Sequence, residues 1–256
     1  MPVELPASFY KKLQGTVGDI AITMDLMRRD STLRGTYFYE KVGLPLTLSG
    51  SLSATGAVTM AEYVGQGDET GSFAGKFSDA HTLTGDWMSA ANHKTLPFKL
   101  TEMLDGKPRI AMEHFREENC ATRDHYRKEA GRDSLGDMDP ECSHIDVATI
   151  VVETGTPSVD AVIAAEILKT QIRIIFDEES RAGGNAPKTL PDYLHNIQKL
   201  ELEGMLQRDQ TVDIITNDRG ILCLSAGGYE YSGGAHGIGW IEYLNLDLET
   251  GKRLKL

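Results

Sequence analysis

The sequence predicts an N-terminal all-β meander barrel or sandwich over residues 9–104 and a C-terminal α+β domain over residues 143–256, in which a helix packs on an antiparallel sheet. Short β-rich segments and turns alternate every roughly 8–12 residues in the first part, which is typical of antiparallel meanders. Beyond residue 143 the apolar residues instead repeat with the 3.6-residue period of helices. A chain of 256 residues is long enough for two such domains.

Eight predicted strands make up the first part. Alternation is clearest in IAITMDLM, where Ile20, Ile22, Met24 and Leu26 share one face. Turn-forming stretches such as RRDST and GQGDET separate the segments. We expect the strands to close into a barrel, because closure removes exposed sheet edges. The predicted strands are residues 15–18, 20–27, 33–40, 44–49, 57–64, 71–77, 82–88 and 96–103.

A weak repeat of glycine followed by an aromatic residue runs through this part, in LRGTYFY, TGSFAGKF and LTGDWM. Glycine lets a strand bend sharply, and the neighbouring aromatic ring can cover the exposed backbone. Tyr37 and Trp87 would line a ligand cavity if the barrel were a small-molecule carrier. We expect them to pack in the core instead, because side chains normally fill small barrels.

Residues 105–142 are predicted to form a charged connector, whose first part, GKPRIAMEHFREENC, either extends the last strand or forms a short helix. Cys120 and Cys142 either form a disulfide, which needs an oxidising compartment, or remain unpaired. Cys223 lies in an apolar run and is expected to be a buried thiol. We expect no metal site, because the available ligands are irregularly spaced. Those ligands are His114, Cys120, His125, Cys142 and His144.

The C-terminal part combines predicted strands and helices. IDVATIVVE, residues 145–153, reads as a strand, and Ser158 is the predicted N-cap of a helix over 159–179. A second amphipathic segment over 190–208 predicts another helix, although LELEGML within it also suits a strand. Three further strands are predicted at residues 211–216, 220–225 and 240–248.

The most unusual stretch is YEYSGGAHG, residues 229–237. Three glycines and an alanine around one histidine leave little side-chain bulk, so the backbone can turn tightly and approach another surface closely. This loop is either a contact surface for a partner or a structural β-turn whose imidazole bonds to local backbone. The candidate binding residues are Tyr229, Tyr231, Ser232, Gly233, Gly234, Ala235, His236, Gly237 and Trp240.

YSGGAHG followed by YLNLDLETGKRLKL resembles the signature of the C-terminal domain in RsiV-type anti-sigma factor ectodomains and PdaC-type bacterial envelope proteins. The resemblance covers about 110 residues, on the general length scale of one domain. It implies an extracytoplasmic α+β domain and, in the RsiV-type branch, binding of lysozyme rather than catalysis. The matching residues are Tyr231, Gly233, Gly234, Ala235, His236, Gly237, Asn245, Asp247, Thr250, Gly251 and Lys252.

Family members usually continue beyond this hairpin with another helix and strands. We therefore expect the C-terminal domain to be incomplete as the sequence stands. The strand over residues 244–248 would then have an unpaired neighbour or an exposed apolar face.

The charge is acidic and unevenly distributed. The formal net charge is −12, and residues 145–256 hold 10 basic and 17 acidic residues, a net of −7. An acidic surface repels phosphate backbones, so we expect no nucleic-acid partner. Acidity favours a cationic partner, although it also serves solubility alone.

We expect a non-enzymatic cell-envelope binding or sensor protein, periplasmic or extracellular, that recognises a cationic protein such as lysozyme or a peptidoglycan fragment. The alternatives are an accessory part of a peptidoglycan-modifying enzyme and a small-molecule carrier. The sequence contains no HExxH, Walker A, GxGxxG or nucleophile-elbow motif, so no catalytic residue or cofactor is predicted. No apolar run is long enough to span a membrane, and no signal or lipid anchor is visible.

Overall fold

The computed structural model describes residues 3–65, 67–104, 108–119, 128, 142–173, 207–231 and 236–255. The chain divides into two compact units. The first combines residues 1–112 with residues 214–222, and the second combines residues 113–213 with residues 223–256. The short segment 214–222 therefore belongs to the same unit as the N-terminal strands, although about 100 residues separate them along the chain.

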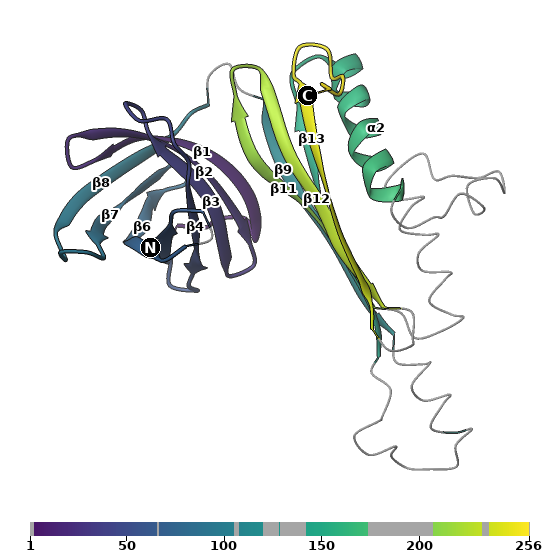
Figure 1. Ribbon diagram of the computed structural model, residues 1–256, viewed down its shortest axis with the longest axis horizontal. Helices are drawn as coiled ribbons and strands as arrows, with labels where there is room; N and C mark the ends of the chain where they lie inside the picture. Colours follow the sequence, from purple (N-terminus) through teal and green to yellow (C-terminus); the bar gives the residue numbers. More distant parts are fainter. Residues whose placement is uncertain are drawn as a thin grey trace. The chain divides into compact units, whose positions relative to one another are not determined.

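The N-terminal strands form a closed eight-stranded barrel, which confirms the predicted barrel and excludes the sandwich (Figure 1). Each strand pairs antiparallel with the next, and β1 closes the barrel against β8. The strands are β1 (Ser8–Val17), β2 (Ile20–Arg29), β3 (Thr32–Tyr39), β4 (Leu46–Leu52), β5 (Ala57–Tyr63), β6 (Glu69–Asp79), β7 (Thr82–Ser89) and β8 (Thr95–Glu102).

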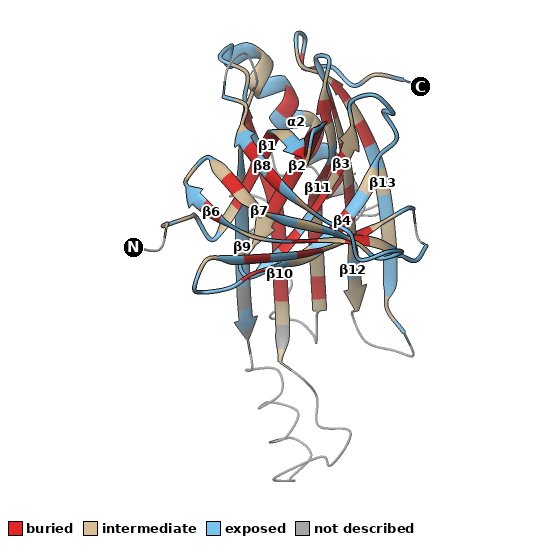
Figure 2. Ribbon diagram, turned by 90° about the vertical axis from the view of Figure 1, so that its left-hand side faces the viewer, coloured by how far each residue is buried: buried red, intermediate tan, exposed pale blue. Residues whose placement is uncertain are grey.

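Apolar and aromatic side chains fill the barrel interior, whose strands carry many of the buried residues in Figure 2. Tyr37 belongs to this core, and Trp87 packs against it. Three aromatic rings contact one another edge to face: Phe73 lies 5.4 Å from Tyr37 and 5.2 Å from Phe98 between ring centroids. Tyr37 and Trp87 are therefore core residues, as expected.

The glycines of the barrel let aromatic rings lie close to the backbone, but the pairing differs from the prediction. A Cβ on Gly71 would lie 2.8 Å from Nε1 of Trp87, and one on Gly75 would lie 2.9 Å from Cζ of Phe98. Trp87 belongs to β7 and Phe98 to β8, whereas both glycines belong to β6. The covering ring thus comes from another strand rather than from the next residues in the sequence, because successive side chains of a strand point to opposite faces.

A five-stranded sheet with the order β13-β12-β11-β10-β9 follows the barrel along the chain (Figure 1). The predicted antiparallel sheet is corrected to a mixed one, because β10 and β11 pair in parallel. Parallel neighbours require a long crossover, and residues 154–206 supply it. The strands are β9 (Arg109–Asn119), β10 (Ser143–Glu153), β11 (Gln207–Asp218), β12 (Ile221–Tyr231) and β13 (Ile238–Asp247).

Strand β9 corrects the prediction for the start of the connector. The segment after residue 108 is neither a continuation of β8 nor a short helix, but the edge strand beside β10. In RIAMEHFREEN, polar residues interrupt the apolar ones without clean alternation, so the pattern indicated no single element.

Helix α2 (Pro157–Arg173) is the only helix with defined ends among the described residues. It begins one residue before the predicted N-cap. Pro157 occupies the first helical position, where its missing N–H costs nothing, so Ser158 lies inside the helix. Asp160 accepts hydrogen bonds from the backbone N–H and the hydroxyl of Thr154, at 2.8 and 2.6 Å, which ties the end of β10 to the helix. Of the second predicted helix, over 190–208, residues 190–206 lie outside the described residues, and Gln207 and Arg208 begin strand β11.

The cysteines have different states. Cys142 is disulfide-bonded, whereas Cys223 on β12 is a free thiol whose pKa is raised by burial. Cys120, which the sequence analysis considered as a partner of Cys142, lies outside the described residues. No group of metal-ligating side chains converges within the described part of the chain. None of the helical residues that the structure describes forms a segment long and apolar enough to cross a membrane.

Candidate functional site on β12 and β13

The structure places most of the predicted binding loop in strands. Tyr229 and Tyr231 lie at the end of β12, whose last residue is Tyr231. Trp240 lies in β13, which begins at Ile238. Tyr229, Tyr231 and Trp240, which the sequence placed in or beside a loop, are therefore corrected to strand residues. Ser232, Gly233, Gly234 and Ala235 lie outside the described residues.

Two aromatic residues of the predicted site, Tyr229 and Trp240, lie on opposite faces of the sheet. Arg208 donates to the carboxylate of Glu230 at 2.7 Å, so these two side chains share a face. A Cβ on Gly228 would lie 2.8 Å from the ring of Trp240, which puts Trp240 on that face as well. Because neighbours along a strand alternate, Tyr229 points to the other face. The structure therefore does not bring Tyr229 and Trp240 into one contact surface.

Helix α2 covers the face that carries Arg208. Ile145 on β10 pairs in register with Arg208 on β11, so the two side chains share a face. Thr149, four residues further along β10 on the same face, donates from its hydroxyl to Gln171 of α2 at 3.0 Å. The opposite face of the sheet holds Tyr229 together with two alternate residues of β13, Ile241 and Tyr243. We call these three residues the open face.

The open face is apolar and exposed. Tyr229 is 38 % exposed, Ile241 62 % and Tyr243 56 %. Their neighbours of opposite orientation, Leu244 and Leu246, are buried. Three large exposed side chains on adjacent strands differ from the single exposed apolar residues that are normal on protein surfaces, and such patches commonly mark interaction sites.

Glycine lets the ring of Tyr229 lie close to the backbone just before β13. A Cβ on Gly237 would lie 2.4 Å from Cζ and from the hydroxyl oxygen of Tyr229, so no side chain fits at this position. His236, just before it, is exposed, and its Nδ1 lies 3.3 Å from the Gly237 carbonyl oxygen. Tyr229, His236 and Gly237 are the predicted site residues that the structure brings together.

Acidic residues flank the open face on the same side of the sheet. His144 of β10 lies 3.4 Å from Asp209 of β11, and His114 of β9 lies 2.8 Å from Asp146 of β10. Asp209 and Tyr229 both alternate with residues of the α2-covered face, so they belong to the same side. Neither pair is deeply buried, so the two carboxylates remain within reach of a partner.

The matched hairpin after β13 forms the tight turn that its sequence predicts. The Asp247 carboxylate accepts the backbone N–H of Glu249 at 2.8 Å and of Thr250 at 2.9 Å, which lowers the pKa of that carboxyl below its usual range. Gly251 has φ +73°, and a Cβ there would lie 2.8 Å from the Val159 carbonyl of α2. The chain then returns along β13, where Leu254 N–H donates to Asn245. This turn therefore fixes the end of β13 against α2.

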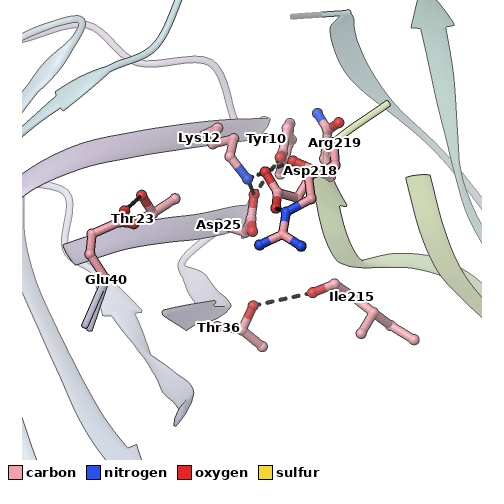
Figure 3. Close-up of polar contacts among 10 residues, drawn as sticks. Tyr10, Lys12, Thr23, Asp25, Thr36, Glu40, Ile215, Asp218 and Arg219 are labelled. Atoms are coloured by element: carbon pink, nitrogen blue, oxygen red, sulfur yellow. Dashed lines mark hydrogen bonds and ion pairs between the residues drawn. The ribbon is translucent and has the colours of Figure 1, made fainter. Parts of the chain in front are cut away.

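A buried polar cluster that the sequence did not predict lies on the outer face of β1 and β2 (Figure 3). The Tyr10 hydroxyl donates to Asp25 at 2.5 Å, and Lys12 Nζ lies 3.5 Å from the same carboxylate oxygen. Lys12 also donates to the backbone carbonyl of Asn217 at 2.5 Å. Residues 214–222 belong to this unit and bury the cluster, and Thr36 donates to the Ile215 carbonyl at 3.2 Å beside it.

Burial dominates the electrostatics of the cluster. It raises the pKa of Asp25 above its usual range, although Lys12 and Tyr10 favour the charged carboxylate. Burial and the neighbouring Asp25 together raise the pKa of Tyr10. Alternation in IAITMDLM gave no sign that Asp25 is buried, because a covering segment some 190 residues away leaves no local trace in the sequence. Two adjacent lysines inside an aromatic strand, FYKKL, were the available signal.

No protein-family model and no curated protein matches this chain. Two solved structures are similar to it. One is a member of the DUF3298 family from Bacteroides fragilis NCTC 9343, with 14 % sequence identity and a TM-score of 0.40, covering 59 % of this chain and 60 % of that one. The other is a DUF3298 family protein from Pseudomonas aeruginosa PAO1, with 13 % identity and a TM-score of 0.40, covering 59 % of this chain and 57 % of that one. The matched region thus spans less than two thirds of either solved chain.

Proposed function

We propose that this protein is a non-enzymatic binding or sensor protein of the bacterial cell envelope that recognises a cationic protein through the open face. The observation that carries the proposal is the exposure of Tyr229, Ile241 and Tyr243 on adjacent strands. Aromatic residues are enriched among the residues that dominate binding energy at protein interfaces. Lysozyme is the partner that the sequence resemblance to RsiV-type ectodomains suggests.

Charge supports a basic partner over a neutral one. Residues 145–256 have a net charge of −7, from 10 basic and 17 acidic residues. Asp146 and Asp209 lie on the side of the sheet that carries the open face. An apolar patch with acidic residues on the neighbouring strands β11 and β10 matches a basic protein that has an apolar contact patch, because complementary charges steer the encounter.

Two further observations bear on the alternatives. The disulfide at Cys142 supports residence in an oxidising compartment, outside the cytoplasm. The packed barrel interior gives no support to a small-molecule carrier that would use it, because side chains occupy that space. An accessory role beside a peptidoglycan-modifying enzyme stays compatible with the proposal, since such a role also needs a protein-binding surface.

Titration calorimetry with a panel of lysozymes, at low and moderate salt, tests the proposal. Ile241→Ser and Tyr229→Ser should each weaken binding about tenfold or more, as expected for central interface residues. The matched control is Leu44→Ser, because Leu44 is exposed to a similar extent but lies in a barrel turn. His236→Ala tests whether the histidine contributes beyond the open face.

Binding that is lost in Ile241→Ser and kept in Leu44→Ser supports the proposal. Absence of binding to every lysozyme removes lysozyme as the partner. Binding with equal affinity in all four variants removes the open face from the interaction. A peptidoglycan fragment that binds more tightly than any lysozyme would instead make the ligand a glycan.

A further inference from the structure

Strand β13 lies at one margin of the five-stranded sheet (Figure 2), and the described part of the chain pairs with only one end of its outer edge. After β13 the chain turns back, and Leu254 N–H donates to the Asn245 carbonyl at 2.7 Å. The Arg253 side chain donates to the Tyr243 carbonyl at 2.9 Å. Asn245 and Tyr243 therefore direct their carbonyls outward, away from β12.

The rest of this outer edge is unpaired among the described residues. Backbone groups alternate in direction along a strand, so Gly239 and Ile241 point outward together with Tyr243. The Trp240 carbonyl points the other way, because a Cβ on Gly227 of β12 would lie 3.0 Å from its oxygen. No described residue outside the sheet forms a backbone hydrogen bond with this stretch of β13. Outward N–H and C=O groups in a row are a template for another strand.

The unpaired stretch contains no proline and no uncompensated charge, two features that commonly protect a sheet edge. Ile238 is 70 % exposed, Ile241 62 % and Tyr243 56 %. The one charged side chain, Glu242, forms an ion pair with Arg253 at 2.8 Å, so the stretch is locally neutral although the whole chain has a net charge of −12. A neutral and apolar edge favours a neutral and apolar strand as its partner.

The same stretch of a second copy has these properties, and its register is self-complementary. The free part of β13 runs from its first residue, Ile238, to the residue before Asn245, and Ile241 lies at its centre. In an antiparallel pair with two-fold symmetry, Ile241 would lie opposite Ile241 of the second copy and Gly239 opposite Tyr243. Each of these pairs would exchange two backbone hydrogen bonds, so every outward N–H and C=O group would be used. Glycine opposite tyrosine leaves room for the ring to cover the backbone.

We propose that two copies of this chain associate through the outer edge of β13, by antiparallel pairing of residues 239–243 that joins both sheets into one. The two open faces would lie on the same side of the joined sheet, because the two-fold axis is perpendicular to it. So short a pairing buries less than the roughly 1,200 Å² of a stable interface, so we expect a reversible dimer with a dissociation constant of about 10 μM to 1 mM. The proposal does not depend on whether the open face binds a cationic protein.

Sedimentation velocity of the full chain, from about 1 μM to 1 mM, tests the proposal over the expected range of affinity. The dimer fraction should rise with protein concentration. It should also rise with added salt, because salt screens the repulsion between two copies that each carry −12. Binding of a cationic protein should weaken with salt instead, so the failure of one proposal is distinguishable from the failure of the other.

Charge variants at the centre of the pairing test its register. Ile241→Lys and Ile241→Glu should each abolish the dimer, because like charges would lie directly opposite one another. An equimolar mixture of the two variants should dimerise again, since a lysine would then face a glutamate. Tyr229→Lys is the matched control: it adds the same charge to the open face but lies on β12, away from the edge, and it should dimerise as the wild type does.

Three results would overturn the proposal. The first is a wild-type chain that stays monomeric up to about 1 mM at high salt. The second is a mixture of Ile241→Lys and Ile241→Glu that stays monomeric although circular dichroism shows both variants folded, since Ile241 would then not lie opposite itself. The third is equal loss of the dimer in Tyr229→Lys, which would mean that the open faces stack instead of the edges pairing.

Discussion

Glu62 is a buried carboxylate inside the barrel that three side chains bind. Tyr37 and Trp87 donate to its Oε2 at 2.5 and 2.7 Å, and Thr70 donates to Oε1 at 2.6 Å. The carboxylate is 4 % exposed, so these bonds replace its hydration. Burial, together with the bond to Glu62, raises the pKa of Tyr37, which therefore remains a hydrogen-bond donor throughout the range in which the protein is handled.

Replacement of Glu62 tests how strongly this group holds the barrel together. Glu62→Ala leaves three donors without an acceptor, and each buried donor without a partner costs about 1–3 kcal/mol. The free energy of unfolding should therefore fall by about 3 kcal/mol or more. Glu62→Gln should cost less, because its amide oxygen still accepts. Glu69→Ala, at an exposed glutamate of the same barrel, is the control and should change little. Urea unfolding followed by circular dichroism measures all three, and equal stability of Glu62→Ala and Glu69→Ala would contradict the prediction.

Asp25 is expected to make stability depend on pH. Its folded-state pKa is raised, so the folded protein holds the proton more tightly than the unfolded chain does. The stability that Asp25 contributes is therefore fully present below its ordinary pKa of about 3.9 and is lost as the pH rises through the folded value. Asp25→Asn has no such titration.

Urea unfolding of the wild type and of Asp25→Asn across a pH series measures this effect. The free energy of unfolding of the wild type, minus that of the variant, should fall as the pH rises above about 4. A difference that rises with pH would mean that Lys12 outweighs burial. Asp30→Asn, at an exposed turn of the same barrel, controls for the loss of one charge.

Close backbone approach between strands explains several glycines of the barrel. A Cβ on Gly50 of β4 would lie 1.9 Å from the Thr59 carbonyl oxygen and 2.6 Å from Met60 Cα of β5. Both atoms belong to the backbone of a paired strand, so neither can move without breaking the ladder. Gly50→Ala should therefore destabilise the barrel by about 2–3 kcal/mol, the cost of overpacking.

Thermal unfolding of Gly50→Ala beside Ser49→Ala provides the measurement. Ser49 is exposed on the same strand and points away from the interior, so its replacement should be nearly neutral. A Gly50→Ala variant as stable as Ser49→Ala would mean that β4 and β5 separate more easily than their pairing indicates.

Strands and turns of the barrel could be predicted because their signals are local. Seven of the eight predicted segments overlap most of an observed strand, and only β1 begins much earlier than expected, at Ser8 instead of residue 15. Lysines are rarely buried without a charged partner, and Lys11 and Lys12 are buried there in ion pairs with Glu102 and Asp25. Pairing partners left no local signal, so the parallel β10–β11 pair could not be predicted.

The binding residues were predicted less well than the strands. Composition around His236 indicated a compact, side-chain-poor segment, and Tyr229 does lie against Gly237. The division of Tyr229 and Trp240 between opposite faces depends on where β12 and β13 end, which the sequence did not define to within one residue. Ile241 and Tyr243 were read only as strand residues, because exposure depends on which face α2 covers.

The acidity of the molecule should govern how fast it meets a basic partner. With a net charge of −12, the association rate should fall as salt is added, because screening shortens the reach of the field to about 8 Å at physiological ionic strength. Asp146→Asn and Asp209→Asn, beside the open face, should slow association with the cationic protein more than Asp19→Asn in a barrel turn.

Stopped-flow association measured over a salt series distinguishes these effects. The three variants carry the same net charge, so a difference among them reports the position of the charge rather than its amount. Identical rates for all three would mean that the overall charge alone steers the partner, and a rate independent of salt would exclude electrostatic steering altogether.

Residues 214–222 belong to the same unit as the barrel but are synthesised about 100 residues later, which affects how the barrel folds during synthesis. A ribosome adds about 5–20 residues per second, so the barrel strands emerge roughly 5–20 s before the segment that covers Tyr10, Lys12 and Asp25. During that interval an apolar outer face would invite aggregation. Because the face carries an ammonium, a carboxylate and a hydroxyl, the nascent barrel remains hydrated while it waits for its cover. The same side chains that form a buried cluster in the finished protein therefore protect its first half during synthesis.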